Sequence, residues 1–335
     1  MMKAVQFNPA ESINDPNVAA MIEMEKPIVS GRDVLVRVEA VAMNPVDTKV
    51  RPKVGGEARI LGFDAAGVVV ECGELVDGLE LGDKVYYSGN IQRSGSNAEF
   101  QLVDERLVAK RPESISPAQA ASVPLTGLTA WEALFDRLLI DSDNEGRTLL
   151  IIGGAGGMGS MGIQLAKLAG LKVIATASRE SSAAWCRDLG ADHVIDHRAP
   201  LLPQLQELGI QAVDYVANFN NTSAYWEAVG EVIAPQGKVV LIVEPEGELH
   251  LGRAYKTKSV TIVWEFMATR PIFNTPDVGR QAWILGQLAE LIDTGKLRPS
   301  VGEVMGTINV ENLVAAHQAI ESGRTIGKLV LEGWD

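Results

Sequence analysis

One segment near the middle of the chain joins four large apolar residues to a cluster of glycines and then to an amphipathic stretch. The apolar run is Leu149–Ile152 and the amphipathic stretch is Ser160–Leu168, an order typical of a buried strand, a tight turn and a helix. Between them, Gly154, Gly156 and Gly159 match the pattern G-x-G-x-x-G. Such glycines permit a sharp turn, close approach to a pyrophosphate and close helix–strand packing, while the N-terminus of the helix attracts phosphate. The flanking strand and helix favour dinucleotide binding over a merely tight structural turn.

Strand-like and helix-like stretches alternate through the middle of the chain. The expected strands cover residues 149–152, 172–177, 194–195, 213–217, 238–243 and 260–263. The expected helices cover residues 129–139, 160–168, 181–189, 201–208 and 223–233. This alternation predicts an α/β domain with a doubly wound, parallel Rossmann sheet.

The first 120 or so residues have a different pattern. Short strands are expected over residues 34–41, 66–71 and 83–87, and glycine-containing turns separate them. Many short strands with frequent turns predict a small β-rich barrel or sandwich. A helix is expected over residues 280–294, and a final strand over residues 327–331 could rejoin this β-rich module.

Composition limits the partners and the compartment. The chain has 335 residues, 46% of them hydrophobic, which is enough for about two packed domains. Its net charge of −13 disfavours nucleic acid and anionic membranes as partners, although plain solubility explains the charge equally well. Cys72 and Cys186 are the only cysteines, and the N-terminus has no apolar signal region. We therefore expect a cytoplasmic protein with no membrane span.

The residues after the second Rossmann strand indicate which nicotinamide cofactor binds. NAD-binding domains usually carry an acidic residue there to hold the ribose 2′-hydroxyl. This chain carries Ser178 and Arg179 instead, and a guanidinium can grip a 2′-phosphate. We therefore predict NADPH, although Arg179 could be a solvated charge and Glu180 a displaced ribose acid. His197, after the third strand, is a further candidate beside the adenine ribose, or an ordinary surface histidine.

Several short segments together resemble the medium-chain dehydrogenase/reductase superfamily. They are Asn44–Asp47, Leu61–Gly67, Gly82–Val85, Leu125–Trp131, Gly153–Gly159, Leu189–Asp192 and Gly327–Lys328. The chain is most similar to the zinc-free, quinone-oxidoreductase-like branch, some of whose members carry a zinc-type alcohol dehydrogenase-like name. The resemblance implies a chaperonin-10-like, β-rich catalytic domain over residues 1–123 and 268–335, and a Rossmann domain over residues 124–267.

Zinc-binding members of that superfamily carry a cysteine, then Gly-His-Glu, then another cysteine. Here Asn44 stands at the first position and Gly62-Phe63-Asp64 at the second, and a phenyl ring cannot ligate zinc. Neither cysteine lies where the last ligand belongs, and the four histidines form no spaced ligand pair. We therefore expect no metal.

The resemblance also implies roles for individual residues. Asn44 and Asp47 would lie near the nicotinamide and the substrate as catalytic residues. The remaining residues would contact the cofactor: Thr126, Thr129, Gly154, Gly156, Gly157, Met158, Gly159, Ser178, Arg179, Asn218, Ile242 and Lys328. Structural alternatives stay open, because Asn44-Pro45 could be a turn, Asp47 could cap a helix, and both threonines could begin one.

Without zinc, conjugated acceptors are the easier substrates, because conjugation delocalises the arriving negative charge. We therefore predict hydride transfer from NADPH to a quinone or an α,β-unsaturated carbonyl.

Tyr86 or Tyr87 could supply a proton, although nothing in their spacing indicates it. The stretches Val50–Gly56 and Met267–Asp277 are expected to shape the substrate cleft. The alternatives are a zinc-dependent alcohol dehydrogenase and a non-catalytic NADPH-binding sensor or scaffold. The apolar strand over residues 259–264 and the resemblance both favour a homodimer, although a helix of the same chain could instead cover this edge.

Overall fold

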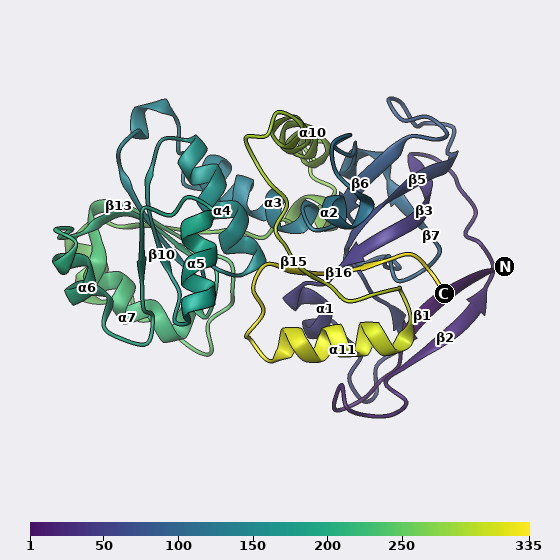
Figure 1. Cartoon of the computed structure of the whole chain (residues 1–335), viewed down its shortest axis with the longest axis horizontal. Helices are drawn as coiled ribbons and strands as arrows, with labels where there is room; N and C mark the ends of the chain where they lie inside the picture. Colours follow the sequence, from purple (N-terminus) through teal and green to yellow (C-terminus); the bar gives the residue numbers. More distant parts are fainter. The chain divides into compact units, whose positions relative to one another are not determined.

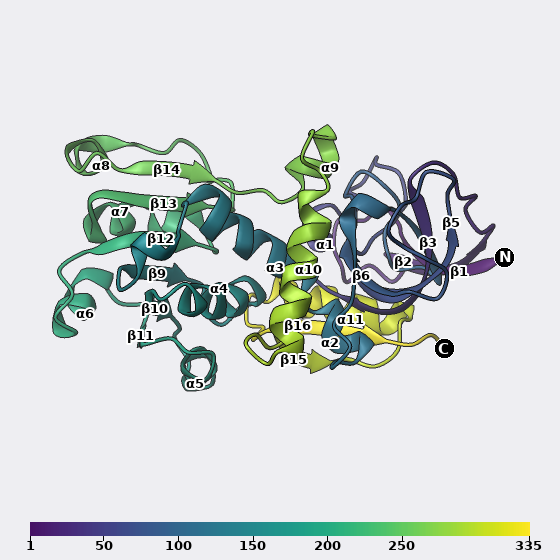
Figure 2. The ribbon, with the colours of Figure 1, turned by 90° about the horizontal axis from the view of Figure 1, so that it is seen from above.

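The protein is described by a computed structural model of all 335 residues, which divides into two compact units. The first unit combines Met1–Leu128 with Ala268–Asp335, and the second consists of Thr129–Met267. Figures 1 and 2 show the second unit in teal and green. No helix in the chain combines the length and the apolar character needed to cross a membrane.

The second unit is built from strands that alternate with helices. In chain order its elements are β9 (Thr148–Ile152), α4 (Gly157–Leu168), β10 (Lys172–Thr176), α5 (Glu180–Asp188), β11 (His193–Ile195), α6 (Leu201–Glu207), β12 (Val213–Asn218), α7 (Thr222–Val232), β13 (Ile233–Leu241), α8 (Gly252–Thr257) and β14 (Thr261–Trp264). The six strands form one sheet in the order β11-β10-β9-β12-β13-β14, and every pairing is parallel. Counted within the unit, this is the Rossmann order 3-2-1-4-5-6.

Alternate residues of β9 show that helices cover both faces of this sheet. Leu150 belongs to a hydrophobic cluster that includes Leu205 of α6 and Val229 of α7. Its neighbour Ile151 lies on the opposite face, where its side chain approaches Gly162 of α4. The sheet is therefore doubly wound, as the alternating sequence pattern predicts.

The first unit is rich in short strands. Its elements before the second unit are β1 (Met2–Phe7), β2 (Ala19–Met24), β3 (Asp33–Ala42), α1 (Pro45–Lys49), β4 (Arg59–Ile60), β5 (Asp64–Cys72), β6 (Lys84–Ser88), β7 (Phe100–Asp104), a 3-10 turn (Glu105–Leu107), β8 (Val108–Lys110), α2 (Pro117–Ala121) and the start of α3 (Pro124–Trp131), whose residues from Thr129 on belong to the second unit. Those after it are α9 (Thr269–Phe273), α10 (Arg280–Asp293), β15 (Val301–Val304), α11 (Val310–Glu321) and β16 (Lys328–Glu332).

The strands of the first unit form two sheets. The larger runs in the order β15-β16-β3-β5-β6-β8, with β7 also paired to β3, and the smaller in the order β2-β1-β4. The last strand, β16, lies antiparallel to β3 with Val330 opposite Ala42. The prediction that the final strand rejoins the N-terminal module is therefore confirmed, and β16 lies beside β3 in the larger sheet.

Some predicted boundaries are wrong. The helix expected over residues 129–139 begins at Pro124, because proline is favoured at a first helical position whose N–H needs no partner. It continues as a π-helix over Glu132–Arg137 and stops at Leu139, whose φ of +57° is left-handed. The helix expected from Ser160 begins at Gly157, since the glycine turn itself supplies the first helical residues.

Candidate active site

The glycine segment forms a tight turn between β9 and α4. Gly153 has a φ of +87°, a conformation that favours glycine, and Gly156 is the N-cap of α4. The N–H of Gly153 donates to Thr176 Oγ1 at 3.0 Å, and the N–H of Gly154 donates to the backbone oxygen of Thr176 at 3.2 Å. Two hydrogen bonds therefore tie the turn to the end of the neighbouring strand β10.

The turn has no room for side chains at two of its glycines. A Cβ on Gly154 would lie 2.7 Å from Ala175 Cβ and 3.0 Å from Cys186 Sγ. A Cβ on Gly159 would overlap the backbone oxygens of Gly153 and Gly154. The N–H groups of the first turn of α4 have no carbonyl partner within their helix, so they remain available to an anion. This arrangement fits a pyrophosphate.

Ser178 and Arg179 lie where β10 ends and α5 begins. Both are half-buried, and Arg179 is the N-cap of α5, where its backbone N–H donates to Ser182 Oγ at 3.2 Å. Glu180, the alternative ribose acid, is 87% exposed and pairs with Arg187 at 3.3 Å. The end of the strand is therefore lined by a hydroxyl and a guanidinium, while the nearest carboxylate has a basic partner on its own helix.

The other expected nucleotide residues of the second unit lie near the carboxyl ends of its strands. Asn218 ends β12 and is fully buried, and its side chain holds the following loop through Asn220 N–H at 3.1 Å and the Asn221 oxygen at 3.3 Å. Ile242 directly follows β13 and is half-buried. His197 packs edge-on against Tyr225 with 6.5 Å between ring centroids, and burial lowers the pKa of His197.

Thr126 and Thr129 lie on α3, and both are buried. The Thr126 hydroxyl donates to backbone oxygens of the preceding turn, at 3.4 Å to Ser122 and 3.3 Å to Val123. Thr126 thus lies in the first turn of α3 and bonds to the backbone just before that helix, which is the helix-start geometry that the sequence left open as an alternative.

The first unit contains a buried polar cluster formed by Asn44, Asp64 and Lys328, which come from the start of α1, from β5 and from β16. The Lys328 ammonium donates to Asn44 Oδ1 at 2.5 Å and to Asp64 Oδ2 at 2.8 Å. Asn44 Nδ2 donates to the same Asp64 oxygen at 2.8 Å and to the Ala42 oxygen at 3.3 Å. The three residues are between 0 and 3% exposed, so the ion pair lies in the interior. We call this set the Asn44–Asp64–Lys328 cluster.

The other carboxylate oxygen of Asp64 reaches a fourth segment. Asp64 Oδ1 accepts the N–H of Leu125, in the first turn of α3, at 2.7 Å. Asp64 therefore joins three elements at one side chain. The sequence prediction missed this residue as part of the site and noted it only as a departure from a zinc motif.

Asp47 lies beside the cluster and closes the first turn of α1. Its Oδ2 accepts the Asn44 N–H at 2.8 Å, completing a capping box, and its Oδ1 accepts the Gly62 N–H at 3.1 Å. Complete burial raises the pKa of Asp47 to about 7, against the lowering effect of the two N–H groups and of Lys328. Asp47 thus has the helix-capping geometry that the sequence left open as an alternative.

The two tyrosines considered as proton donors are both internal. Tyr86 donates its hydroxyl to the Leu285 oxygen at 2.6 Å, and Tyr87 donates to Gln101 Oε1 at 2.9 Å. Both side chains are fully buried, and burial raises the pKa of each phenol far above its usual range. Neither hydroxyl is placed to give a proton to a substrate.

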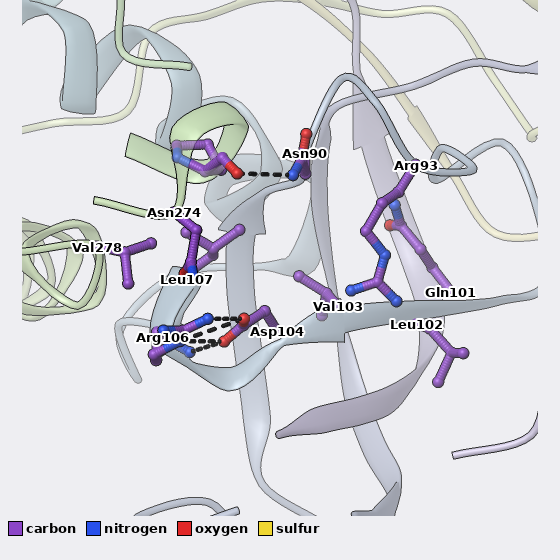
Figure 3. A pocket seen from close by; sticks show the side chains of 11 residues that line it. Asn90, Arg93, Gln101, Leu102, Val103, Asp104, Arg106, Leu107, Asn274 and Val278 are labelled. Atoms are coloured by element: carbon purple, nitrogen blue, oxygen red, sulfur yellow. Dashed lines mark hydrogen bonds and ion pairs between the residues drawn. The ribbon is translucent and has the colours of Figure 1, made fainter. Parts of the chain in front are cut away.

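Two cavities within the first unit touch the stretches expected to shape the substrate cleft. One of about 350 Å³ is lined by residues such as Thr48, Arg51 and Val54. Another of about 50 Å³ includes Pro271 and Asn274 in its lining (Figure 3). Figure 3 shows Arg106 paired with Asp104, and the other arginine of the lining, Arg93, pairs with Asp33 at 2.7 Å. No group of three or more His, Cys, Asp or Glu residues in the chain has the arrangement of a metal site.

Comparison with known proteins identifies the family. Residues 30–113 match the alcohol dehydrogenase GroES-like domain, and residues 189–331 match the zinc-binding dehydrogenase domain. A zinc-type alcohol dehydrogenase-like protein of Staphylococcus epidermidis is 42% identical over 334 residues, covering 98% of this chain and 99% of the relative. The 2-methylene-furan-3-one reductase of Solanum lycopersicum is 30% identical, over 91% of this chain and 73% of the relative.

Solved structures agree with this result. A Rhizobium etli CFN 42 protein that bears the name of a zinc-dependent alcohol dehydrogenase is 42% identical, with a TM-score of 0.94 over 100% of this chain and 98% of that one. A Pseudomonas syringae quinone oxidoreductase is 26% identical, with a TM-score of 0.82 over 99% and 100%. A mycobacterial protein solved with NADPH is 25% identical, with a TM-score of 0.82 over 99% and 100%.

The chain is therefore an oxidoreductase of the medium-chain dehydrogenase/reductase superfamily. Within it, the chain belongs to the zinc-free branch, and it is similar in structure to a quinone oxidoreductase. The predicted fold class, a Rossmann sheet plus a chaperonin-10-like β-rich domain, is confirmed.

Proposed function

We propose that the protein is an NADPH-dependent reductase that delivers hydride to a quinone or an α,β-unsaturated carbonyl without a metal ion. The choice of NADPH rests on the residues at the end of β10, where Ser178 and Arg179 replace the usual acidic residue that binds the ribose. A 2′-phosphate there would meet a guanidinium, and Glu180 would not repel it strongly because Arg187 neutralises that carboxylate. The mycobacterial structure with NADPH, at 25% identity, supports the same choice.

In this proposal the second unit, Thr129–Met267, is the nucleotide-binding domain and the first unit is the catalytic domain. The backbone N–H groups of Gly157, Met158 and Gly159 would hold the pyrophosphate. The bound nicotinamide would supply the hydride. Further contacts to the nucleotide would come from Thr126, Thr129, His197, Asn218 and Ile242.

The Asn44–Asp64–Lys328 cluster supports the metal-free part of the proposal. A carboxylate and an amide oxygen would be possible ligands for a divalent ion, but here the Lys328 ammonium already lies between them. Quinones and enones need no Lewis acid as strong as zinc, because their conjugation spreads the incoming charge. The tomato relative, named as a reductase of an exocyclic enone, and the Pseudomonas quinone oxidoreductase are consistent with this substrate class.

The reaction is tested by following the loss of reduced nicotinamide absorbance with a quinone panel and an enone panel. Turnover of either panel with NADPH, in protein that contains no stoichiometric zinc, is the expected result. Stoichiometric zinc with turnover of simple alcohols would establish an alcohol dehydrogenase instead. No turnover despite tight NADPH binding would favour a sensor or scaffold.

The cofactor preference is tested with Arg179→Ala. Losing a charge-assisted pair costs about 1.5–3 kcal/mol, so NADPH affinity should fall by about ten- to a hundredfold while NADH affinity stays nearly unchanged. Arg253→Ala, an exposed arginine on α8 of the same unit, is the matched control and should affect neither nucleotide. Equal weakening of NADPH and NADH by Arg179→Ala would show that Arg179 does not recognise the 2′-phosphate.

We also propose a homodimer that pairs through β14. This strand is the edge of the Rossmann sheet, and its Trp264 side chain is 49% exposed. An unpaired edge with apolar side chains favours pairing with a second copy. Sedimentation velocity should give a dimer for the wild type and a monomer for Trp264→Lys; a wild-type monomer would refute the proposal.

A further inference from the structure

We propose that Lys328 donates a hydrogen bond to the acceptor oxygen on which negative charge develops, and that Asp64 is the positioning residue that aims its ammonium. This inference rests on the proposed reductase function. It assigns to Lys328 a role toward the acceptor rather than toward the cofactor, and it gives Asp64 a role that the sequence motif alone does not provide.

The first step is a count of hydrogen-bond donors in the cluster. Asn44 has two amide hydrogens, and both have acceptors, at Asp64 Oδ2 and the Ala42 oxygen. Lys328 has three ammonium hydrogens but only two acceptors in the chain, Asn44 Oδ1 and Asp64 Oδ2. Lys328 therefore holds the donor that is left for a ligand, whereas Asn44 has only acceptor capacity left.

The second step is the orientation of the amide. An ammonium only donates and a carboxylate only accepts, so Lys328 must face the Asn44 oxygen and Asp64 must face its nitrogen. Rotating the amide by half a turn would place N–H against N–H and oxygen against oxygen. The two charged residues therefore fix Asn44 in one orientation, and Asn44 in turn fixes the ammonium.

The third step is the strength of the remaining donor. Lys328 is only 3% exposed, and Asp64 supplies a buried counter-charge at 2.8 Å. A preorganised cationic donor in a water-poor site stabilises a developing oxyanion far better than water does. During reduction of an enone, the hydride that NADPH supplies would form the C–H bond at the β-carbon while the π pair shifts toward the carbonyl oxygen, and the nucleotide would be left as NADP⁺. Water then protonates the enolate at the α-carbon, and Lys328 keeps its three protons.

Reduction rates with the enone panel and the quinone panel provide the test. An enolate is more basic than a hydroquinone anion, so enone reduction depends more on the oxyanion donor. Lys328→Met should lower kcat for enones by about a hundredfold or more and kcat for quinones by about tenfold or less. Asp64→Asn should reproduce this selective loss more weakly, and Lys328→Arg should restore most of the enone rate. Lys49→Met, an exposed lysine on α1, is the control and should change neither rate.

A second measurement does not depend on turnover. With the protein saturated with NADP⁺, 4-nitrophenol is titrated as an oxyanion probe whose ionised form has its own absorbance. The wild type and Lys328→Arg should bind it ionised at a pH where Lys328→Met does not. If Lys328→Met fails to fold, Lys328→Arg and Asp64→Asn can still be compared with the wild type in the rate measurements and in the 4-nitrophenol titration.

Several results would overturn the inference. Equal losses for enones and quinones, together with an equal loss of NADPH affinity, would show that Lys328 holds the cofactor. A selective loss in Asp47→Asn but not in Lys328→Met would make Asp47 the donor. A wild type that reduces neither panel would refute the proposed function itself, whereas an active wild type with an unaffected Lys328→Met would refute only this inference.

Discussion

The glycine turn of the second unit and the Asn44–Asp64–Lys328 cluster of the first are built on opposite principles. The turn works because side chains are missing: a Cβ at Gly159 would overlap the backbone. The cluster works because three polar side chains hydrogen-bond to one another away from water. The turn comes from one contiguous segment, while Asn44 and Lys328 come from opposite ends of the chain.

This difference determines how each site responds to substitution. A site formed by backbone atoms is disrupted when a substitution adds side-chain atoms, because a ligand can then no longer approach the backbone closely. A buried ion pair is broken by removing one partner, because the other charge is then left unpaired in the interior. Substitutions in the two units should therefore differ in how far they lower the free energy of unfolding and in whether they also weaken nucleotide binding.

The largest expected effect comes from breaking the ion pair. Lys328→Met should lower the free energy of unfolding by about 3–5 kcal/mol, because it leaves the Asp64 carboxylate buried and unpaired. The double variant Asp64→Asn with Lys328→Met should lose less than the sum of the two single losses, since it removes both charges. Urea unfolding at neutral pH measures all three.

The matched control is an ion pair at the surface. Lys167 and Asp192 pair at 2.8 Å with about a third of each side chain exposed, and Lys167→Met should cost less than about 1 kcal/mol. If Lys328→Met were no more damaging than Lys167→Met, the cluster would not behave as a buried ion pair.

The next effect concerns the backbone site. Gly159→Ala should cost about 1–3 kcal/mol of stability, because the new Cβ meets the backbone oxygens of Gly153 and Gly154 and the turn must shift. NADPH affinity should fall with it. Gly286→Ala is the control: its Cβ would meet no atom within 4 Å on helix α10, so it should stabilise the protein by about 0.5–1 kcal/mol. Thermal unfolding and nucleotide titration distinguish the two, and a harmless Gly159→Ala would contradict the packing argument.

The same contrast explains what the sequence could predict. The glycine turn and the order of the Rossmann strands follow from local patterns, because parallel strands alternating with helices allow few topologies. The boundaries were less predictable: the residues that form the first turn of α4 are the turn glycines themselves, which have no helical periodicity.

The cluster could not be predicted in this way. Asn44 and Lys328 meet because β16 pairs with β3, and Asp64 joins them because β5 pairs with β3 on its other side, with Asp64 opposite Ala42. Strand register over such sequence separations leaves no local pattern. The family resemblance identified Asn44 and Lys328 separately, but neither the motif nor its departure from zinc ligands indicated that Asp64 connects them.

A buried side chain without a partner gives the next test. His317 is fully buried in the first unit, its ring is stacked on Phe7 at 4.5 Å, and neither ring nitrogen has a hydrogen-bond partner. Burial, with a smaller contribution from Arg51, lowers the pKa of His317 to about 3. The unfolded chain therefore binds the proton more readily, and stability falls as pH drops from about 6.5 toward 3.

We expect His317 to account for about 1.4 kcal/mol of lost stability per pH unit within that window. His317→Leu keeps a similar volume and should flatten this part of the curve of unfolding free energy against pH. The wild type and the variant are compared by urea unfolding at several pH values between 7 and 4. Parallel curves would show that His317 has a polar partner or titrates normally.

The smallest effect concerns the side chain that holds the backbone site in place. Thr176→Val keeps the shape of the buried side chain but removes the Oγ1 that accepts the Gly153 N–H at 3.0 Å. We expect a loss of about 1 kcal/mol in stability and a severalfold loss in NADPH affinity, because the turn keeps its glycines but loses one of its two bonds to β10. Thr294→Val, at the exposed end of α10, should change neither quantity appreciably. If Thr176→Val lowered stability but left NADPH affinity intact, backbone packing alone would hold the glycine turn in its binding conformation. The turn would then need no side chain for its function, unlike the Asn44–Asp64–Lys328 cluster.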